Sequence, residues 1–151
     1  MQENVKGVAI SLEGKNAIVT GGGGGMGRCT ALMLAAAGAN LVVSDVNAET
    51  AEATAREAIE KYGVKAVATK CNVTVKSEVD AMVELSVKTL GRIDILNHVA
   101  GVFGAVDFMK STEADYDKQM DINAKGTYFV DQAVLRIMIP NRAGKIVNMC
   151  S

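Results

Sequence analysis

Glycines gather in one short stretch whose spacing could bind a phosphate group. Five consecutive glycines, Gly21 to Gly25, are followed by Met26 and Gly27. Gly21, Gly25 and Gly27 lack a Cβ, so they allow a sharp turn, a close approach of backbone to a ligand and close packing of helix on strand. The helix that follows would present unpaired N–H groups and a positive dipole to an anion. The stretch therefore predicts a pyrophosphate site, and an ordinary turn before a helix is the alternative.

An acidic residue lies about 20 positions further along the chain. Residues 40–45 have the pattern of a buried strand, and this strand ends in Asp45. A carboxylate at this place in a strand, glycine turn, helix, strand unit can accept hydrogen bonds from the ribose of an adenosine. Asp45 could instead cap the next helix. The complete order of elements favours the ribose interpretation.

The composition excludes several classes of protein. Of the 151 residues, 49% are hydrophobic and 22% are charged, which suits one globular domain with a buried core. The formal net charge of −1 gives no basic footprint for nucleic acid or for an anionic membrane surface. No apolar run is long enough to cross a bilayer, and residues 1–6 lack the pattern of a signal peptide. We therefore expect a cytoplasmic protein.

The three cysteines indicate neither a disulfide framework nor a zinc site, because their number is odd and no CxxC spacing occurs. Each lies inside a predicted helix or strand. We expect Cys29, Cys71 and Cys150 to be small buried core residues, and we predict no metal site.

Apolar segments of two periodicities alternate along the chain and must position the glycine stretch and Asp45. The predicted strands are residues 16–19, 40–45, 65–71, 93–99 and 145–150. The predicted helices are residues 26–37, 47–62, 74 or 77 to 90, and a long one from 111 or 112 to about 138. An irregular loop is expected over residues 102–110.

Apolar residues recur at helical spacing in each predicted helix and indicate its inner face. These residues are Met26, Cys29, Met33 and Ala37 in the first helix; Ala51, Ala55, Ala58 and Tyr62 in the second; Val79, Met82, Val83 and Leu90 in the third; and Tyr116, Met120, Ile122, Thr127, Val130, Val134 and Ile137 in the fourth.

Strict alternation of strands and helices predicts an α/β fold. Parallel strands need crossover connections, which are right-handed, so helices should cover both faces of one parallel sheet. We expect the strand order 3-2-1-4-5. In that order the direction of winding reverses beside the first strand, so the glycine turn and the turn at Ala100 and Gly101 should flank a ligand crevice.

At these positions the chain resembles the short-chain dehydrogenase/reductase family, over essentially its whole length. Thr20-Gly21-x-x-x-Gly25-Met26-Gly27 is similar to the cofactor loop of the family, and residues 12–15 are similar to its lead-in. The resemblance implies a Rossmann-type, doubly wound parallel sheet. Asp45 takes the position that favours NAD over NADP in the family, because a carboxylate repels a 2′-phosphate. Neither Gly24 nor Val46 supplies the Arg or Lys that would accept that phosphate.

The resemblance also implies adenine contacts from Asn72 and Val73, where the family has an Asp-Val pair. The implied cofactor-binding residues are Gly21, Gly24, Gly25, Met26, Gly27, Asp45, Val46, Asn72, Val73, Ala100 and Gly101.

The clearest departure from the family is His98-Val99-Ala100-Gly101, which replaces Asn-Asn-Ala-Gly. His98 is the only histidine of the chain. A general base would need a partner that the sequence does not identify. We therefore favour a polar side chain at a strand end that hydrogen-bonds to neighbouring backbone.

Two catalytic residues are implied by the resemblance. Asn123 matches the helix asparagine that holds a proton-relay water in the family, with a polar residue on a solvated helix face as the alternative. Residues 144–151 resemble the strand that ends in the catalytic serine, so Ser151 takes that role. The tyrosine and lysine of the Tyr-x-x-x-Lys motif would follow Ser151, so we expect a domain over residues 1–151 that is incomplete at its C-terminus and inactive alone.

The resemblance implies an NAD-dependent oxidoreductase that interconverts a small-molecule alcohol and carbonyl by hydride transfer. A non-catalytic dinucleotide-binding or sensor protein is one alternative. A methyltransferase that uses S-adenosylmethionine is another, since it shares the glycine loop and the acid after the second strand.

The resemblance further implies a homo-oligomer, a dimer or tetramer, because the long helix packs against a second subunit in the family. A simply buried helix is the alternative. Residues 146–149 would form an exposed sheet edge.

Gly126 and the glycines of the loop, Gly22 to Gly24, lead to separate expectations. Gly126, in mid-helix, should permit a close approach to another helix or to the substrate crevice. Gly22 to Gly24 are demanded by no dinucleotide motif and should make their loop mobile until a ligand orders it.

Overall fold

The computed structural model describes residues 10–104 and 107–150 of the chain. Its centre is a five-stranded sheet of order β3-β2-β1-β4-β5, and every neighbouring pair is parallel. The strands are β1 (Asn16–Thr20), β2 (Asn40–Asp45), β3 (Ala66–Lys70), β4 (Ile95–His98) and β5 (Lys145–Asn148). The predicted fold class and strand order are confirmed.

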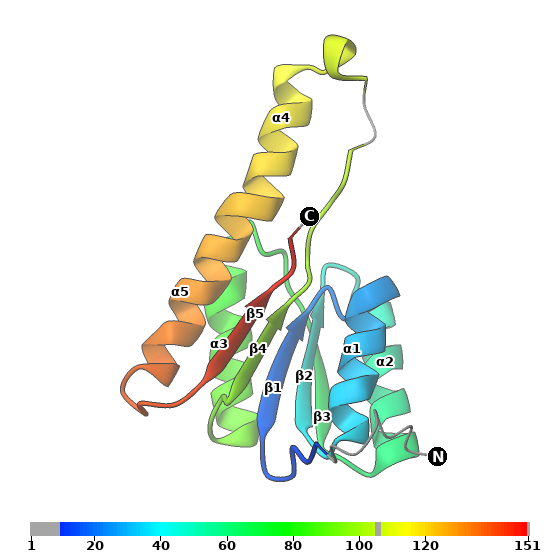
Figure 1. The fold of residues 1–151 in the computed structure, drawn as a ribbon, viewed down its shortest axis with the longest axis vertical. Coiled ribbons are helices and arrows are strands. Elements are labelled where there is room, and N and C mark those ends of the chain that lie inside the picture. The colour runs from blue at the N-terminus through cyan, green and yellow to red at the C-terminus, as the bar shows by residue number, and fades with distance from the viewer. Residues whose placement is uncertain (1–9, 105–106, 151) are drawn as a thin grey trace.

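Helices cover both faces of the sheet (Figure 1). The helices α1 (Gly25–Ala36) and α2 (Ala48–Tyr62) pack on one face, and α3 (Lys76–Leu90) and α5 (Gly126–Met138) pack on the other. Successive side chains of β1 point to opposite faces: Ala17 and Val19 join the core under α1 and α2, whereas Ile18 joins the core under α3 and α5. Strands buried on both faces explain their continuous apolar runs.

The buried face of α1 differs from the prediction. Met26 is 62% exposed and Met33 is 66% exposed, whereas the buried residues of the helix are Gly27, Ala31 and Ala35. The cause is the closeness of the helix to the strand and turn before it, which leaves room only for small side chains. Tyr62, the last residue of α2, is also exposed, against the prediction, whereas Ala51, Ala55 and Ala58 are buried as predicted.

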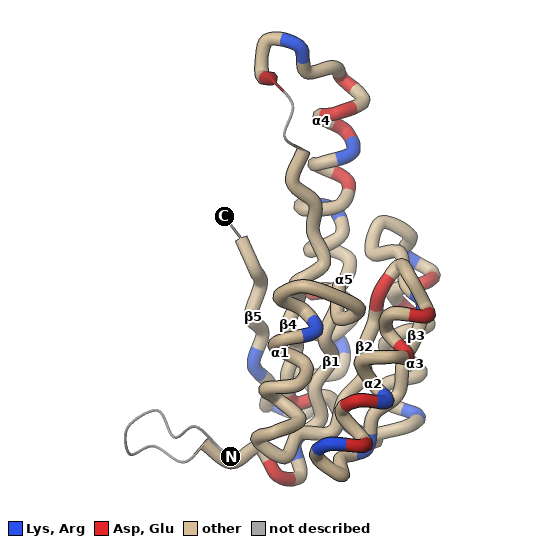
Figure 2. Tube along the Cα trace, turned by 90° about the vertical axis from the view of Figure 1, so that its right-hand side faces the viewer, with Lys and Arg blue, Asp and Glu red and all other residues tan. Residues whose placement is uncertain are grey.

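The predicted long helix is divided into segments. A short 3-10 helix at Phe108–Lys110 precedes α4 (Glu113–Gln119), a π-helix covers Met120–Lys125, and α5 follows. α4 extends beyond the sheet (Figure 1) and carries charges of both signs (Figure 2). Tyr116 in α4 and Met120, the first residue of the π-helix, are therefore exposed. Val130 and Val134 are buried as predicted.

The start of α4 is fixed by a capping box. The Thr112 hydroxyl accepts a hydrogen bond from the Asp115 N–H, and the Asp115 carboxylate accepts one from the Thr112 N–H. The hydrogen bond from the Thr112 hydroxyl holds the pKa of Asp115 below its usual value. The helix therefore begins where the sequence predicts.

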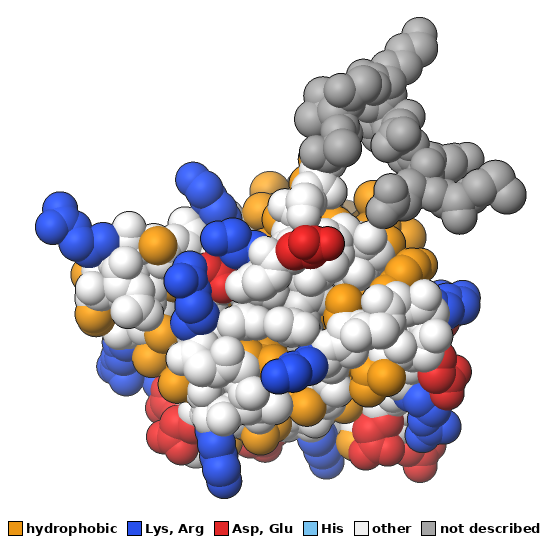
Figure 3. Space-filling view, turned by 90° about the horizontal axis from the view of Figure 1, so that it is seen from below, with side chains coloured by type: hydrophobic (Ala, Val, Ile, Leu, Met, Phe, Trp, Pro, Cys, Tyr) orange, Lys and Arg blue, Asp and Glu red, His pale blue; other side chains and the backbone are white. Residues whose placement is uncertain are grey.

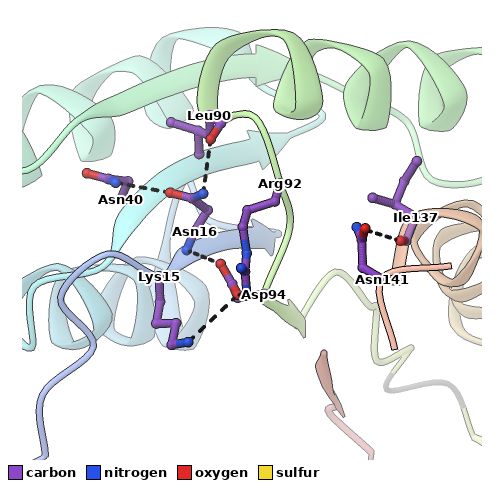
Figure 4. A network of polar contacts seen from close by, with 8 residues as sticks. All are labelled: Lys15, Asn16, Asn40, Leu90, Arg92, Asp94, Ile137 and Asn141. Carbon is purple, nitrogen blue, oxygen red and sulfur yellow. Dashed lines mark hydrogen bonds and ion pairs between the residues drawn. The ribbon is translucent and has the colours of Figure 1, made fainter. Parts of the chain in front are cut away.

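A network of polar contacts joins the amino ends of three strands (Figure 4). Asp94 Oδ2 accepts a hydrogen bond of 3.1 Å from the Asn16 N–H, and its carboxylate forms ion pairs with Lys15 and Arg92. The Asn16 amide donates to the Leu90 carbonyl and accepts from Asn40 Nδ2. On this end of the molecule, basic and acidic side chains are interspersed (Figure 3).

The cysteines follow the prediction only in part. Cys71 is buried, and burial raises the pKa of its thiol to about 11. Cys29 and Cys150 are exposed, which contradicts the prediction, because α1 turns Cys29 outward and Cys150 follows the exposed edge strand β5. Val147 in β5 is 54% exposed, in agreement with the predicted edge. Among the described residues, no helix has the length and apolarity that crossing a membrane requires.

Candidate functional site

A crevice of about 300 Å³ lies at the carboxyl ends of β1 and β4. It is lined by Gly21, Gly24, Met26, Gly27, Asp45, Val99, Ala100 and Gly101. The structure thus brings most of the predicted cofactor residues together at the point where the winding of the sheet reverses. Gly25, Val46, Asn72 and Val73 lie outside this lining. Val99 was missed, although its place beside Ala100 could have indicated it.

The glycine motif is needed because backbone meets backbone. A Cβ on Gly27 would lie 2.0 Å from the Gly21 carbonyl oxygen, and a Cβ on Gly21 would lie 2.8 Å from the Ala100 nitrogen. Gly21 and Gly25 also have positive φ angles of 64° and 49°. These contacts draw the first turn of α1 against β1 and bring the turn after β4 beside it.

Two of the middle glycines are required by packing, a demand that is separate from the dinucleotide motif. A Cβ on Gly22 would lie 2.6 Å from Val43 Cγ1, and a Cβ on Gly23 would lie 2.2 Å from Thr50 Oγ1. Of these three middle glycines, Gly24 alone has open space where a Cβ would lie. The sequence pattern could not reveal this, because Val43 and Thr50 approach the loop only in the folded protein.

Asp45 is a positioned acceptor at one end of the crevice. Its Oδ2 accepts a hydrogen bond of 2.9 Å from the Gly23 N–H, and its Oδ1 accepts one of 3.0 Å from the Asn47 N–H. The cap of α2 is Asn47, whose Oδ1 accepts from the Glu49 and Thr50 N–H groups. The alternative role of Asp45 as the helix cap is therefore wrong.

His98 lies behind the crevice wall and is buried. Its Nδ1 lies 2.8 Å from Thr20 Oγ1, and that oxygen accepts hydrogen bonds of 3.2 Å from the Val99 and Ala100 N–H groups. Burial lowers the pKa of His98, and the nearby Asp131 carboxylate partly opposes the shift. His98 thus contacts a threonine hydroxyl, whereas the sequence predicted a direct contact with backbone.

Asn123 lies in the π-helix and connects it to the segment after β4. Its Oδ1 accepts a hydrogen bond of 2.9 Å from the Val102 N–H, and its Nδ2 donates one of 2.9 Å to the Val102 carbonyl. The side chain therefore makes a contact across 21 positions of sequence, even though the residue is exposed. Its role in holding a water stays a prediction. Ser151 lies outside the described residues.

Asn72 and Val73 lie in the loop after β3. Asn72 Oδ1 accepts hydrogen bonds from the N–H and hydroxyl of Thr74, which leaves the amide nitrogen as the group oriented for another partner. A Cβ on Gly126 would lie 2.7 Å from Val73 Cγ2. The close approach predicted for Gly126 is thus to this loop, and not to a helix or to the crevice.

A protein-family model described as short chain dehydrogenase matches residues 15–151. The chain belongs to this family. The match covers the glycine loop, Asp45 and both strands that border the crevice. It also removes the grounds for the methyltransferase alternative.

Curated relatives in the family act on several kinds of substrate. The chain is 39% identical over 142 residues to a 5-keto-D-gluconate 5-reductase of Escherichia coli strain K12, covering 94% of this chain and 56% of the relative. It is 39% identical over 143 residues to a sorbitol dehydrogenase of Cereibacter sphaeroides, covering 94% and 54%. The chain therefore spans a little over half the length of these relatives.

Solved structures of the family superpose closely on this fold. An NAD⁺-bound xylitol dehydrogenase matches with a TM-score of 0.89 at 36% identity, over 92% of this chain and 54% of its own. A 7α-hydroxysteroid dehydrogenase in complex with NADH and 7-oxo glycochenodeoxycholic acid matches with a TM-score of 0.89 at 35% identity, over 95% of this chain and 55% of its own.

Proposed function

We propose that the protein is an NAD-dependent oxidoreductase that interconverts an alcohol and a carbonyl group. The observation that carries the proposal is the Asp45 carboxylate, which borders the crevice and is held by two backbone N–H groups. A carboxylate held in this way can accept hydrogen bonds from ribose hydroxyls and disfavours a phosphate at the same place. No residue of the crevice lining is basic.

The residues around the crevice fit a dinucleotide. The glycine loop has no side chains beyond Cα where the close contacts occur, so a pyrophosphate could approach the backbone and the N-terminus of α1. When bound, the nicotinamide would supply or accept the hydride. The chain's own residues would bind and orient it, and the Val99 to Gly101 turn would form the wall on the β4 side.

The substrate class is proposed at the level of alcohol and carbonyl compounds. The relatives named above act on a keto sugar acid and on a polyol, and a similar solved structure holds a steroid. None of the residues that line the crevice is a tyrosine, lysine or histidine that could transfer the proton. We therefore also propose that residues 1–151 alone bind NAD without turnover.

Binding of NAD and NADP to the wild-type protein tests the proposed cofactor. We expect isothermal titration calorimetry to give tighter binding of NAD. Asp45→Asn should weaken NAD binding about tenfold, because a charge-assisted hydrogen bond contributes about 1.5–3 kcal/mol. Asp80→Asn is the matched control, because Asp80 pairs with Lys76 on α3, away from the crevice. Tighter binding of NADP would overturn the assignment.

Activity of the full-length protein tests the reaction. A panel of polyols, keto sugar acids and hydroxysteroids, each offered with NAD or NADH as its redox state requires, should give a change in NADH absorbance with at least one class. Tight NAD binding without turnover on any of them would favour the non-catalytic binder instead.

We further propose a homo-oligomer, a dimer or tetramer, in the cytoplasm. The outer face of α5 supports this, because an apolar groove of about 570 Å³ there is lined by residues such as Tyr128, Leu135 and Ile139. A monomeric mass by light scattering would contradict it.

A further inference from the structure

The hydroxyl of Thr20 lies between three polar groups behind the crevice wall. Its oxygen is 3.2 Å from the Val99 nitrogen, 3.2 Å from the Ala100 nitrogen and 2.8 Å from His98 Nδ1. The two backbone nitrogens can only donate, so they occupy both lone pairs of the Thr20 oxygen. The hydroxyl hydrogen is left for the third contact.

This count of donors and acceptors determines which ring nitrogen of neutral His98 carries the hydrogen. Thr20 must donate to His98 Nδ1, so Nδ1 carries no hydrogen. The neutral ring then carries its hydrogen on Nε2. Burial of the ring favours this neutral form and lowers the pKa of His98.

Asp131 acts electrostatically on the His98 ring and is itself incompletely bonded. Among the described residues, His98 Nε2 and Asp131 Oδ1 are both buried without a hydrogen-bond partner. Asp131 Oδ2 accepts a hydrogen bond of 2.7 Å from Asn148 Nδ2, which ties α5 to the end of β5. Thr20 of β1 and Asn148 of β5 carry no charge, so Asp131 is the titratable group that acts on the ring.

We propose that neutral His98 is a positioning residue that holds the crevice wall through Thr20, and that uptake of a proton by His98 releases this wall and weakens dinucleotide binding. The ligand in this statement rests on the function proposed above. The proton-controlled contact between His98, Thr20 and the turn does not.

The release follows from the geometry. A proton on Nδ1 turns an acceptor into a donor, and Thr20 Oγ1 has no lone pair left to receive it. Either the ring moves away or an N–H of Val99 or Ala100 loses its acceptor. Both N–H groups belong to residues that line the crevice. Burial of the ring also disfavours its charged form, so the change should occur below the usual histidine pKa of about 6.5.

Nitrogen-15 NMR of the full-length protein tests the tautomer directly, with His98→Asn identifying the signals by difference. At neutral pH we expect Nδ1 to be unprotonated and Nε2 protonated. Hydrogen exchange at the Val99 and Ala100 amides should accelerate as the pH falls through the pKa measured for His98. A protonated Nδ1 in the neutral protein, or exchange that ignores the titration, would overturn the proposal.

Binding of NAD across the same pH range tests the functional consequence. The wild-type affinity should fall about three- to tenfold through the His98 titration, which corresponds to the loss of one net hydrogen bond. The side-chain amide that His98→Asn introduces can still accept from Thr20 but cannot take up a proton, so that step should vanish. The Thr20→Val variant should bind NAD weakly at every pH, and its NAD affinity should show no step at the pKa of His98.

These outcomes separate the two proposals. If NAD does not bind at any pH while the amide exchange follows the titration of His98, the proposed cofactor is wrong. The proton-controlled contact between His98, Thr20 and the turn then stands. If NAD binds and wild type and His98→Asn share one pH profile, the cofactor stands and the role of His98 is wrong.

Discussion

The two ends of the parallel sheet treat their buried polar groups differently. At the amino end, Asp94 and Asn16 bond to each other and to neighbouring backbone, as Figure 4 shows. At the carboxyl end, buried atoms of Ser44, His98 and Asp131 have no partner among the described residues. Buried polar atoms without partners cost free energy, so they need water or a ligand. Among the described residues, the polar groups of the amino end bond to one another, whereas the carboxyl end holds these three incomplete groups and, separately, the crevice.

The difference follows from the topology. In an open parallel sheet, the loops after the strands splay apart where the winding reverses, and the loops before them do not. We therefore expect substitutions that disturb the crevice at the carboxyl end to affect binding, and substitutions at the amino end to affect stability alone.

The largest effect should come from Gly27→Ala at the carboxyl end. The new Cβ would meet the Gly21 carbonyl oxygen at 2.0 Å, and backbone cannot yield as a flexible side chain can. We expect loss of about 3 kcal/mol of unfolding free energy in urea and loss of measurable NAD binding by calorimetry.

Gly24→Ala is the matched control for Gly27→Ala. Gly24 lines the same crevice, its φ of −159° suits any residue, and its Cβ would meet nothing within 4 Å. Stability should change by less than about 1 kcal/mol. Equal losses in both variants would refute the steric explanation.

An intermediate effect, on stability alone, should come from Asp94→Ala at the amino end. The change leaves the buried Asn16 N–H without its side-chain acceptor and removes the partner of Lys15 and Arg92. We expect a loss of about 2 kcal/mol in urea unfolding. NAD affinity should stay within about twofold, because Asp94 does not line the crevice. Loss of a hydrogen bond within the crevice would lower the affinity by more than this. Weaker NAD binding at unchanged stability would break the comparison between the two ends.

The smallest effect should come from Gly126→Ala, which tests whether a carboxyl-end contact outside the crevice acts only on stability. The new Cβ would crowd Val73 Cγ2 at 2.7 Å, while alanine favours the helix by about 1 kcal/mol. We expect a net loss of about 1 kcal/mol in urea, with NAD binding unchanged.

The double variant Gly126→Ala with Val73→Ala completes a mutant cycle. Removing the Val73 methyl groups should relieve the crowding, so the two changes should couple favourably by about 1 kcal/mol. Additive losses would show that Val73 already yields to the new methyl group.

The fold was predicted best where the signal was a local pattern of residue types in the sequence. Apolar periodicity predicted the strands and their order, because a strand and a helix differ in period and parallel strands need crossovers. The interior of α1 was predicted wrongly, because methionine and alanine both fit an apolar stripe. Only the contact between Gly27 and Gly21 shows that the helix lies too close for methionine.

The candidate site was predictable where a motif carries its own geometry. Asp45, Gly21 and Gly27 were found from spacing alone, and the structure brings them to one crevice, whereas Gly25 lies outside its lining. The packing that requires glycine at positions 22 and 23 could not be found from spacing, because Val43 and Thr50 reach the loop from other elements. The π-helix at Asn123 was likewise invisible to a pattern of 3.6 residues per turn.

The sequence by itself determined the order of the elements, the family and the position of the glycine loop, because these depend on residue types at fixed spacing. Only the tertiary structure decided what His98 does. Its partner Thr20 is 78 positions away, and the hydrogen on its ring follows from which lone pairs Val99 and Ala100 have already taken. A protonation state is set by all the neighbours of a group, and those neighbours meet only when β1 and β4 pair.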